Sequence, residues 1–231
     1  MSRRCAFITF GIAVLLLMGA ACTRTVSVPL TNSSVELGNF VNDGKGTMVL
    51  RVGATDITGW TVITDELAWV GTPNPWSLSA HDGDRFLDLT AYPAGAPFGG
   101  IAQTIATIPQ HKYQLSYYLG SHTARWGGPP VAIVATAGSE SQVCTVTTPS
   151  SGSTWTPCKM SFTATSDSTA ISLTGKEGSQ YIGLDNVTVE TVEMVWWPLL
   201  LLILLVMAFV IIAIQRRRRT PQREPAAAHI R

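Results

Sequence analysis

Short β-rich runs separated by turn residues fill the middle of this chain. Each run is bounded by clusters of Gly, Pro, Ser, Asn or Asp, and no convincing helical pattern lies among them. The runs cover 25–30, 57–64, 85–90, 100–106, 112–119, 131–137, 141–147, 156–164, 169–174 and 181–190. Many short strands with turn signals between them are typical of an all-β sandwich or barrel.

Alternation within these runs supports the same fold class. In YQLSYYL, the residues Tyr113, Leu115, Tyr117 and Leu119 share one face. This period of two is expected of antiparallel strands that are buried on one side. No low-complexity linker divides the middle of the chain, so we expect a single β-sandwich domain over residues 22–193.

The N-terminus has the pattern of a secretory signal peptide over residues 1–21. Arg3 and Arg4 precede the apolar run Cys5–Met18, and small residues follow at 19–21. Cys22 comes directly afterwards, which leaves two alternatives open. The chain is cleaved as an ordinary secreted protein, or Cys22 is lipidated as in a bacterial lipoprotein.

The C-terminus predicts a transmembrane helix over residues 194–215. The uncharged apolar run Val195–Ile214 contains 20 residues, enough to cross a bilayer core, and begins with an aromatic pair. Four arginines, Arg216–Arg219, follow at once and start a basic tail over 216–231 that we expect to be cytoplasmic and disordered. Together with the signal peptide, this predicts a single-pass membrane protein whose N-terminus and ectodomain lie outside the cytoplasm, at the cell surface or in the periplasm.

The predicted ectodomain is acidic, whereas the predicted cytoplasmic tail is basic. Residues 23–194 contain 8 Lys and Arg against 14 Asp and Glu, a net charge of about −6. This excess of acid argues against a nucleic acid as partner through bulk charge.

Two cysteines remain in the predicted ectodomain. Cys144 and Cys158 flank a turn-rich segment, and an oxidising compartment favours a disulfide between them. No further Cys or nearby His completes a metal site with them.

Several motifs occur in an order that resembles a known family. They are NSSVELG (32–38), ITGWTV (57–62), LAWVG (67–71), HDGDRFLDLT (81–90), GGIAQTIAT (99–107), YQLSYYLGS (113–121), MSFTATSDSTAISLTG (160–175) and YIGLDNVTV (181–189). The series is similar to the DUF642-like, choice-of-anchor family of galactose-binding-like jelly-roll domains. Val35 and Ile105 stand where that family has aromatic residues.

The resemblance implies a jelly-roll β-sandwich related to carbohydrate-binding modules. It implies binding of a cell-wall or surface polysaccharide. It also implies a structural Ca²⁺ ion that ties the first strand to the last, with Glu36 and Asp185 at the matching positions.

Asp185 shares its parity with Val187 and Val189, which predicts that its side chain points toward the core. The apolar phase changes near this residue, which indicates a β-bulge. A buried carboxylate needs a partner, and oxygen ligands suit Ca²⁺. In the alternative, Asp185 caps a turn or accepts hydrogen bonds from backbone N–H groups.

In the run RFLDLT, Leu87 and Leu89 share one face of the predicted strand and Asp88 lies on the other face. The preceding residues His81–Asp84 have the composition of a turn. Asp88 is therefore either a ligand-binding group on a concave sheet, or a strand residue paired with Arg85 or a turn amide.

Four aromatic residues in or near loops complete the predicted ligand site: Trp69, Trp76, Tyr92 and Trp126. Sugar rings stack on exposed aromatic faces, and neighbouring carboxylates bind their hydroxyl groups.

No sequence pattern of a hydrolase, a zinc protease or a nucleotide-binding loop is present. We therefore expect a membrane-anchored, non-catalytic module that binds carbohydrate. The alternatives are an adhesion or structural module that binds proteins and, less favoured, a glycoside hydrolase, for which the chain has carboxylates.

Overall fold

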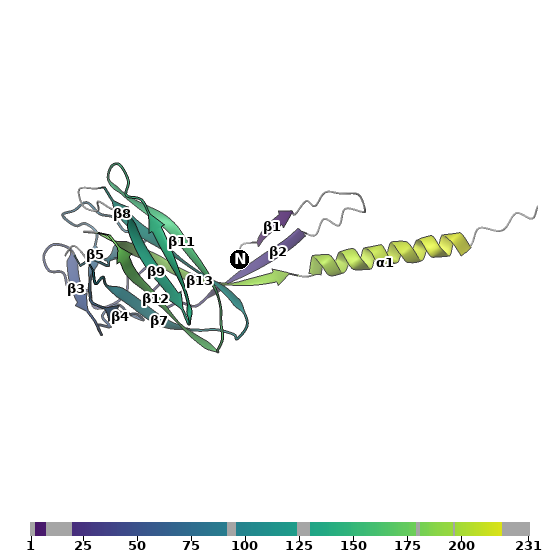
Figure 1. The fold of residues 1–231 in the computed structure, drawn as a ribbon, viewed down its shortest axis with the longest axis horizontal. Helices are drawn as coiled ribbons and strands as arrows, with labels where there is room; N and C mark the ends of the chain where they lie inside the picture. Colours follow the sequence, from purple (N-terminus) through teal and green to yellow (C-terminus); the bar gives the residue numbers. More distant parts are fainter. Residues whose placement is uncertain are drawn as a thin grey trace, which may run out of the picture. The chain divides into compact units, whose positions relative to one another are not determined.

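The computed structural model describes residues 3–7, 20–91, 96–123, 130–178, 181–195 and 197–218. Contacts between residues divide the chain into two compact units. One unit is Thr25–Glu193, and the other combines Met1–Arg24 with Met194–Arg231. Most of the strands belong to the first unit, where they form two sheets (Figure 1).

The larger sheet carries the candidate functional site described below. Its neighbouring strands are, in spatial order, β3 (Thr47–Arg51), β5 (Glu66–Gly71), β6 (Arg85–Asp88), β13 (Gly183–Val195), β8 (Lys112–His122) and β11 (Ser153–Thr163). A further strand, β2 (Ala20–Val28), also neighbours β13. The pairs β3–β5, β5–β6, β6–β13, β13–β8 and β8–β11 are antiparallel.

The smaller sheet lies against the larger one. Its strands are, in spatial order, β10 (Glu140–Val146), β9 (Val131–Ala137), β12 (Ser168–Glu177), β7 (Gly100–Ala106) and β4 (Thr61–Thr64). All of these pairs are antiparallel as well. The unit Thr25–Glu193 is therefore a β-sandwich, which confirms the all-β prediction for it.

The main core fills the space between the two sheets. Tyr113, Leu115, Tyr117 and Leu119 of β8 are all buried in it, as their alternation predicts. Removing such side chains from water is the main favourable term in folding, at about 25 cal/mol per Å² of apolar surface.

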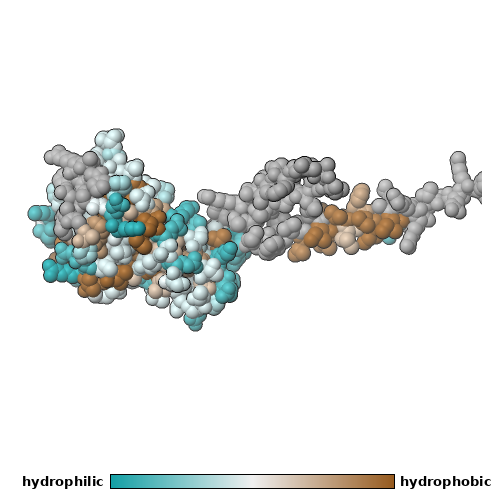
Figure 2. All heavy atoms as spheres, in the orientation of Figure 1, coloured by the Kyte–Doolittle hydropathy of each residue, from teal (hydrophilic) through white to brown (hydrophobic). Residues whose placement is uncertain are grey.

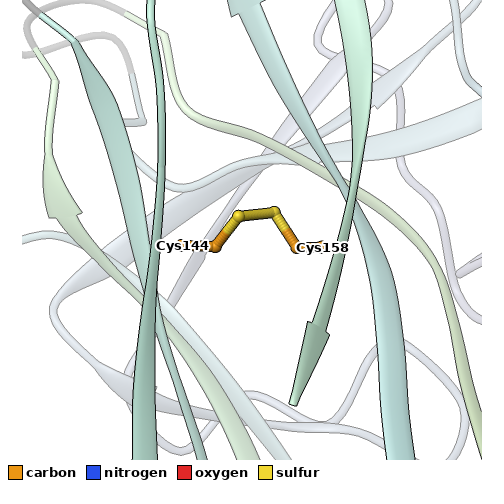
Figure 3. The surroundings of a disulfide bond; sticks show 2 residues. All are labelled: Cys144 and Cys158. Atoms are coloured by element: carbon orange, nitrogen blue, oxygen red, sulfur yellow. A yellow bond between two sulfur atoms is a disulfide. The ribbon is translucent and has the colours of Figure 1, made fainter. Parts of the chain in front are cut away.

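A disulfide joins the two sheets at one side of the sandwich. Cys144 in β10 and Cys158 in β11 are bonded, with their Cα atoms 6.1 Å apart (Figure 3). The predicted pairing is confirmed. It links an edge strand of the smaller sheet to an edge strand of the larger one.

The last strand carries the predicted bulge. The register between β13 and β8 shifts between Asp185 and Thr188, and Asn186 has a positive φ of 47°. The extra residue moves Val187 and Val189 into the core, whereas Asp185 lies opposite Tyr118 on the outer face of the sheet. The prediction that Asp185 points into the core is therefore wrong, because parity does not continue through a bulge.

Within the unit Thr25–Glu193, two strands were absent from the sequence prediction, β3 and β5. The central residues of β5, Leu67–Val70, are all buried. Leu67 and Trp69 belong to the main core, while Ala68 and Val70 belong to a second cluster on the outer face. A strand covered on both faces shows no alternation of polar and apolar residues.

The second unit contains one strand pair and one helix. Strand β1 (Arg3–Phe7) pairs antiparallel with β2, from Arg3 opposite Arg24 to Phe7 opposite Ala20. Helix α1 (Trp197–Arg218) exposes apolar side chains such as Leu204, Leu205 and Phe209 (Figure 2). In the part of the chain that the structure describes, no helix meets the length and apolarity of a membrane span.

Candidate functional site

The outer face of the larger sheet is covered, at one end, by the loop that connects β5 to β6. This loop, residues 72–84, is closed at its base by a 2.8 Å hydrogen bond from the Thr72 N–H to the Asp84 carbonyl. Its residues Leu78 and Ala80 pack against a buried cluster of Ala68, Val70, Phe86 and Tyr181. The loop thus builds a second apolar cluster on a face that would otherwise meet water.

Two glycines make room for this cluster. Gly120 of β8 and Gly183 of β13 lie side by side in the sheet. A Cβ atom on either one would clash with the Tyr181 hydroxyl group. The Tyr181 ring therefore lies directly over the backbone of the sheet, with its hydroxyl between the two strands.

Three half-buried aromatic side chains stand beside the cluster, and we call them the aromatic rim: His81, Tyr118 and Trp155. The rings of His81 and Tyr118 are stacked, with centroids 3.4 Å apart and planes inclined by 19°. Trp155 meets His81 edge to face at 6.2 Å, and its indole N–H donates to the Ser79 carbonyl at 3.0 Å. The rim thus combines the loop with strands β8 and β11.

Two carboxylates hold the end of the loop, and we call this arrangement the carboxylate clasp. Asp185 Oδ2 accepts the backbone N–H groups of His81 at 2.8 Å and Asp82 at 3.0 Å. Glu36 Oε1 accepts those of Asp84 at 3.0 Å and Arg85 at 2.7 Å. The clasp fixes the backbone of residues 81–85 from both sides.

Electrostatics at Asp185 are set mainly by burial. The pKa of this carboxyl is raised to about 7, chiefly by desolvation and to a smaller extent by the nearby Glu36, while the three N–H donors to its oxygens oppose the shift. The donors are His81, Asp82 and Asn186, the last at 2.6 Å. These contacts match the alternative prediction for Asp185, in which it accepts hydrogen bonds from backbone N–H groups.

The donor set does not fit the implied calcium ion. Both oxygens of Asp185 accept N–H groups, and Glu36 divides its oxygens between N–H groups and Arg85, whose Nη1 lies 3.7 Å from Oε2. Among the described residues, no three or more His, Cys, Asp or Glu side chains come together to hold a metal. The carboxylate oxygens that would bind a cation thus face N–H groups and a guanidinium group instead.

Asp88 is buried on the same outer face and is 2% exposed. Its carboxylate accepts the N–H groups of Thr90 at 3.0 Å and Ile182 at 3.1 Å, as well as the Thr90 hydroxyl. Burial raises the pKa of Asp88 to about 6, against the effect of these donors. These contacts match the prediction that Asp88 is a strand residue paired with a turn amide, rather than a ligand-binding group.

The structure separates the aromatic residues that the sequence grouped. Trp69 is fully buried in the main core and donates to the Val35 carbonyl at 2.9 Å, so both of its faces are covered by protein. Trp76 is half-buried in the 72–84 loop. Tyr92 and Trp126 lie outside the described residues.

Sequence reasoning missed His81 and Trp155 as members of one group. A signal for Trp155 was present, because it is out of phase with the buried residues Cys158, Met160 and Phe162 of the same strand. This parity places Trp155 on the outer face. His81 lies in a predicted turn, and no pattern in the sequence indicated that its ring would contact Tyr118 or Trp155.

Comparisons with known proteins place the chain in a family. The model of DUF642, described as a protein of unknown function, matches residues 28–200. The chain belongs to the DUF642 family. No curated protein matches this DUF642 chain.

Several solved structures are similar to this DUF642 protein at low sequence identity. A family 35 carbohydrate-binding module from Clostridium thermocellum is 10% identical, with a TM-score of 0.41, over 72% of this chain and 97% of the module. A module solved with β-1,4-galactotriose is 18% identical, with a TM-score of 0.40, over 70% and 97% of the two chains. A xylan-binding domain from Paenibacillus barcinonensis is 14% identical, with a TM-score of 0.40, over 63% and 92%.

Proposed function

We propose that this DUF642 protein is a non-catalytic carbohydrate-binding module whose binding surface is the aromatic rim. The observation that carries the proposal is the grouping of three half-buried rings, His81, Tyr118 and Trp155, on one face of the sheet. Partly exposed rings offer apolar faces for the C–H groups of a sugar.

Polar groups beside the rim supply the second half of a sugar site. The side-chain amide of Asn186 lies 3.4 Å from His81 Nδ1, and the exposed carboxylate of Asp82 follows His81 in the loop. An amide can donate to and accept from sugar hydroxyl groups, and a carboxylate can accept from them. Rings and polar groups together can thus orient a saccharide.

Predicted signals at the two ends would place this module at a membrane. The signal peptide over 1–21 and the membrane helix over 194–215 stay predictions, and they form part of the proposal. They would hold the sandwich outside the cytoplasm, at the cell surface or in the periplasm. Protease added to intact cells or spheroplasts would then degrade the sandwich and spare a basic C-terminal fragment.

Glycan binding by the full-length protein, first screened on an array and then titrated, tests the function. We expect Tyr118→Ala and Trp155→Ala each to weaken binding about tenfold, because each removes one stacking surface. Val143→Ala, on the exposed outer side of the smaller sheet, serves as the control and should bind like the wild type. Circular dichroism melts check that each variant is folded.

A blank array would contradict the proposal. Capture of a protein partner that soluble glycans fail to displace would favour an adhesion module instead. Release of reducing sugar from a bound glycan would show a hydrolase, since a binding module leaves its ligand intact.

A further inference from the structure

The ring of His81 covers one face of the Tyr118 ring. The two rings are nearly parallel, at a centroid separation of 3.4 Å. A pyranose ring that stacks on tyrosine adopts the same parallel arrangement at similar distance, since both contacts are limited by van der Waals radii. His81 and a bound sugar therefore compete for one position.

The backbone beneath His81 is held independently of its ring. The His81 and Asp82 N–H groups are bound by Asp185, and the following turn is bound by Glu36. Leu78, Ala80 and Trp155 are the partly buried apolar side chains that pack against the second cluster. Rotation of the His81 side chain would leave both the loop backbone and the second apolar cluster in place.

Weak contacts hold the ring on Tyr118. Its Nδ1 lies 3.4 Å from the Asn186 amide nitrogen, which is long for a hydrogen bond, and Trp155 meets it only by an edge contact. Rotamer changes of half-exposed side chains occur within nanoseconds and need no movement of the chain.

We propose that His81 is a gate for the proposed carbohydrate site: the incoming sugar displaces the imidazole ring from Tyr118 and stacks in its place. This inference rests on the proposed function and adds a gating residue to it. The ligand must break the contact between His81 and Tyr118 before it gains its own, so the free protein binds less tightly than an ungated site would.

Removal of the imidazole tests the gate. Titration of full-length wild type and His81→Ala with β-1,4-galactotriose, xylohexaose and cellohexaose should give a Kd that is lower in the variant by about two- to tenfold, the range of one aromatic contact. The same change in a Tyr118→Ala background should give no gain. His111→Ala, a histidine in the turn before β8, serves as the control and should leave the Kd unchanged.

The stacking of His81 on Tyr118 in the free protein can be measured without a ligand. In NMR spectra of the wild type, the imidazole protons of His81 should be shifted upfield by the Tyr118 ring and should return toward ordinary values in Tyr118→Leu.

The outcomes separate the gate from the function it serves. Binding that is weaker or unchanged in His81→Ala overturns the gate alone, and weaker binding would make His81 a direct ligand contact. An absence of binding by both the wild type and His81→Ala to every probe overturns the proposed function, and the gate falls with it. An unshifted His81 resonance overturns the stacked resting state.

Discussion

Asp88 shows how burial alone can make a residue sensitive to pH. Burial raises its pKa from 3.8 to about 6, so between these values the folded chain holds a proton that the unfolded chain has released. Stability therefore falls as pH rises through this range, by about 3 kcal/mol in total. We expect the free energy of unfolding to decline between pH 4 and 7 in the wild type and to decline less in Asp88→Asn, measured by urea titration.

Asp43 provides a matched carboxylate with the opposite shift. Its pKa is lowered, chiefly by the hydrogen bond from the Thr47 hydroxyl, so it contributes stability that is lost only as pH falls below the ordinary range of aspartate. Asp43→Asn should therefore keep the wild-type decline between pH 4 and 7. An equal decline in Asp88→Asn and wild type would show that Asp88 carries no part of it.

At the scale of elements, strands β10 and β11 lie in different sheets and are joined by the disulfide and by a hydrogen bond from the Thr163 N–H to the Glu140 carboxylate. Replacing Cys144 and Cys158 by serine frees a closed segment of about 15 residues in the unfolded chain, which should lower the free energy of unfolding by about 3 kcal/mol. Urea denaturation measures the loss. Dithiothreitol should destabilise the wild type by a similar amount and leave the double serine variant unaffected; an effect of dithiothreitol on that variant would contradict this assignment.

The same scale explains which strands could be predicted. β8 and β12 have one buried and one more exposed side, and their alternation in sequence reveals them. β5 is covered on its second side by the 72–84 loop, so its sequence carries no such period. The prediction that Trp69 belongs to the ligand site was wrong for the same reason. Because β5 was not recognised as a strand, no pattern in the sequence indicated that Trp69 and Leu67 lie on the same, core-facing side.

At the scale of the whole molecule, the site depends on contacts that no local pattern contains. The His81 N–H and the Asp185 carboxylate are separated by 104 positions in sequence, and Trp155 and Ser79 by 76. Sequence motifs predicted the sandwich, the bulge and the disulfide, because each follows from local alternation or composition. The aromatic rim and the carboxylate clasp arise only when the 72–84 loop folds back across the sheet.

The carboxylate clasp joins Glu36, the 72–84 loop and strand β13, so its loss should affect the stability of the whole sandwich. In Asp185→Asn, one carboxylate oxygen becomes an NH₂ group that faces backbone N–H donors. We expect a loss of about 2–4 kcal/mol in the free energy of unfolding. Glu193→Gln, at an exposed position of the same strand, should show no loss.

Chelation distinguishes the clasp from the calcium site that the family resemblance implies. If backbone N–H groups satisfy Glu36 and Asp185, EDTA should leave the melting temperature of the wild type unchanged, and added Ca²⁺ should not raise it. A ligand that binds only the folded state would stabilise it in proportion to the logarithm of its concentration. A melting temperature that falls in EDTA and recovers with Ca²⁺, but does neither in Asp185→Asn, would establish calcium at this position and require the N–H groups of residues 81 and 82 to turn away.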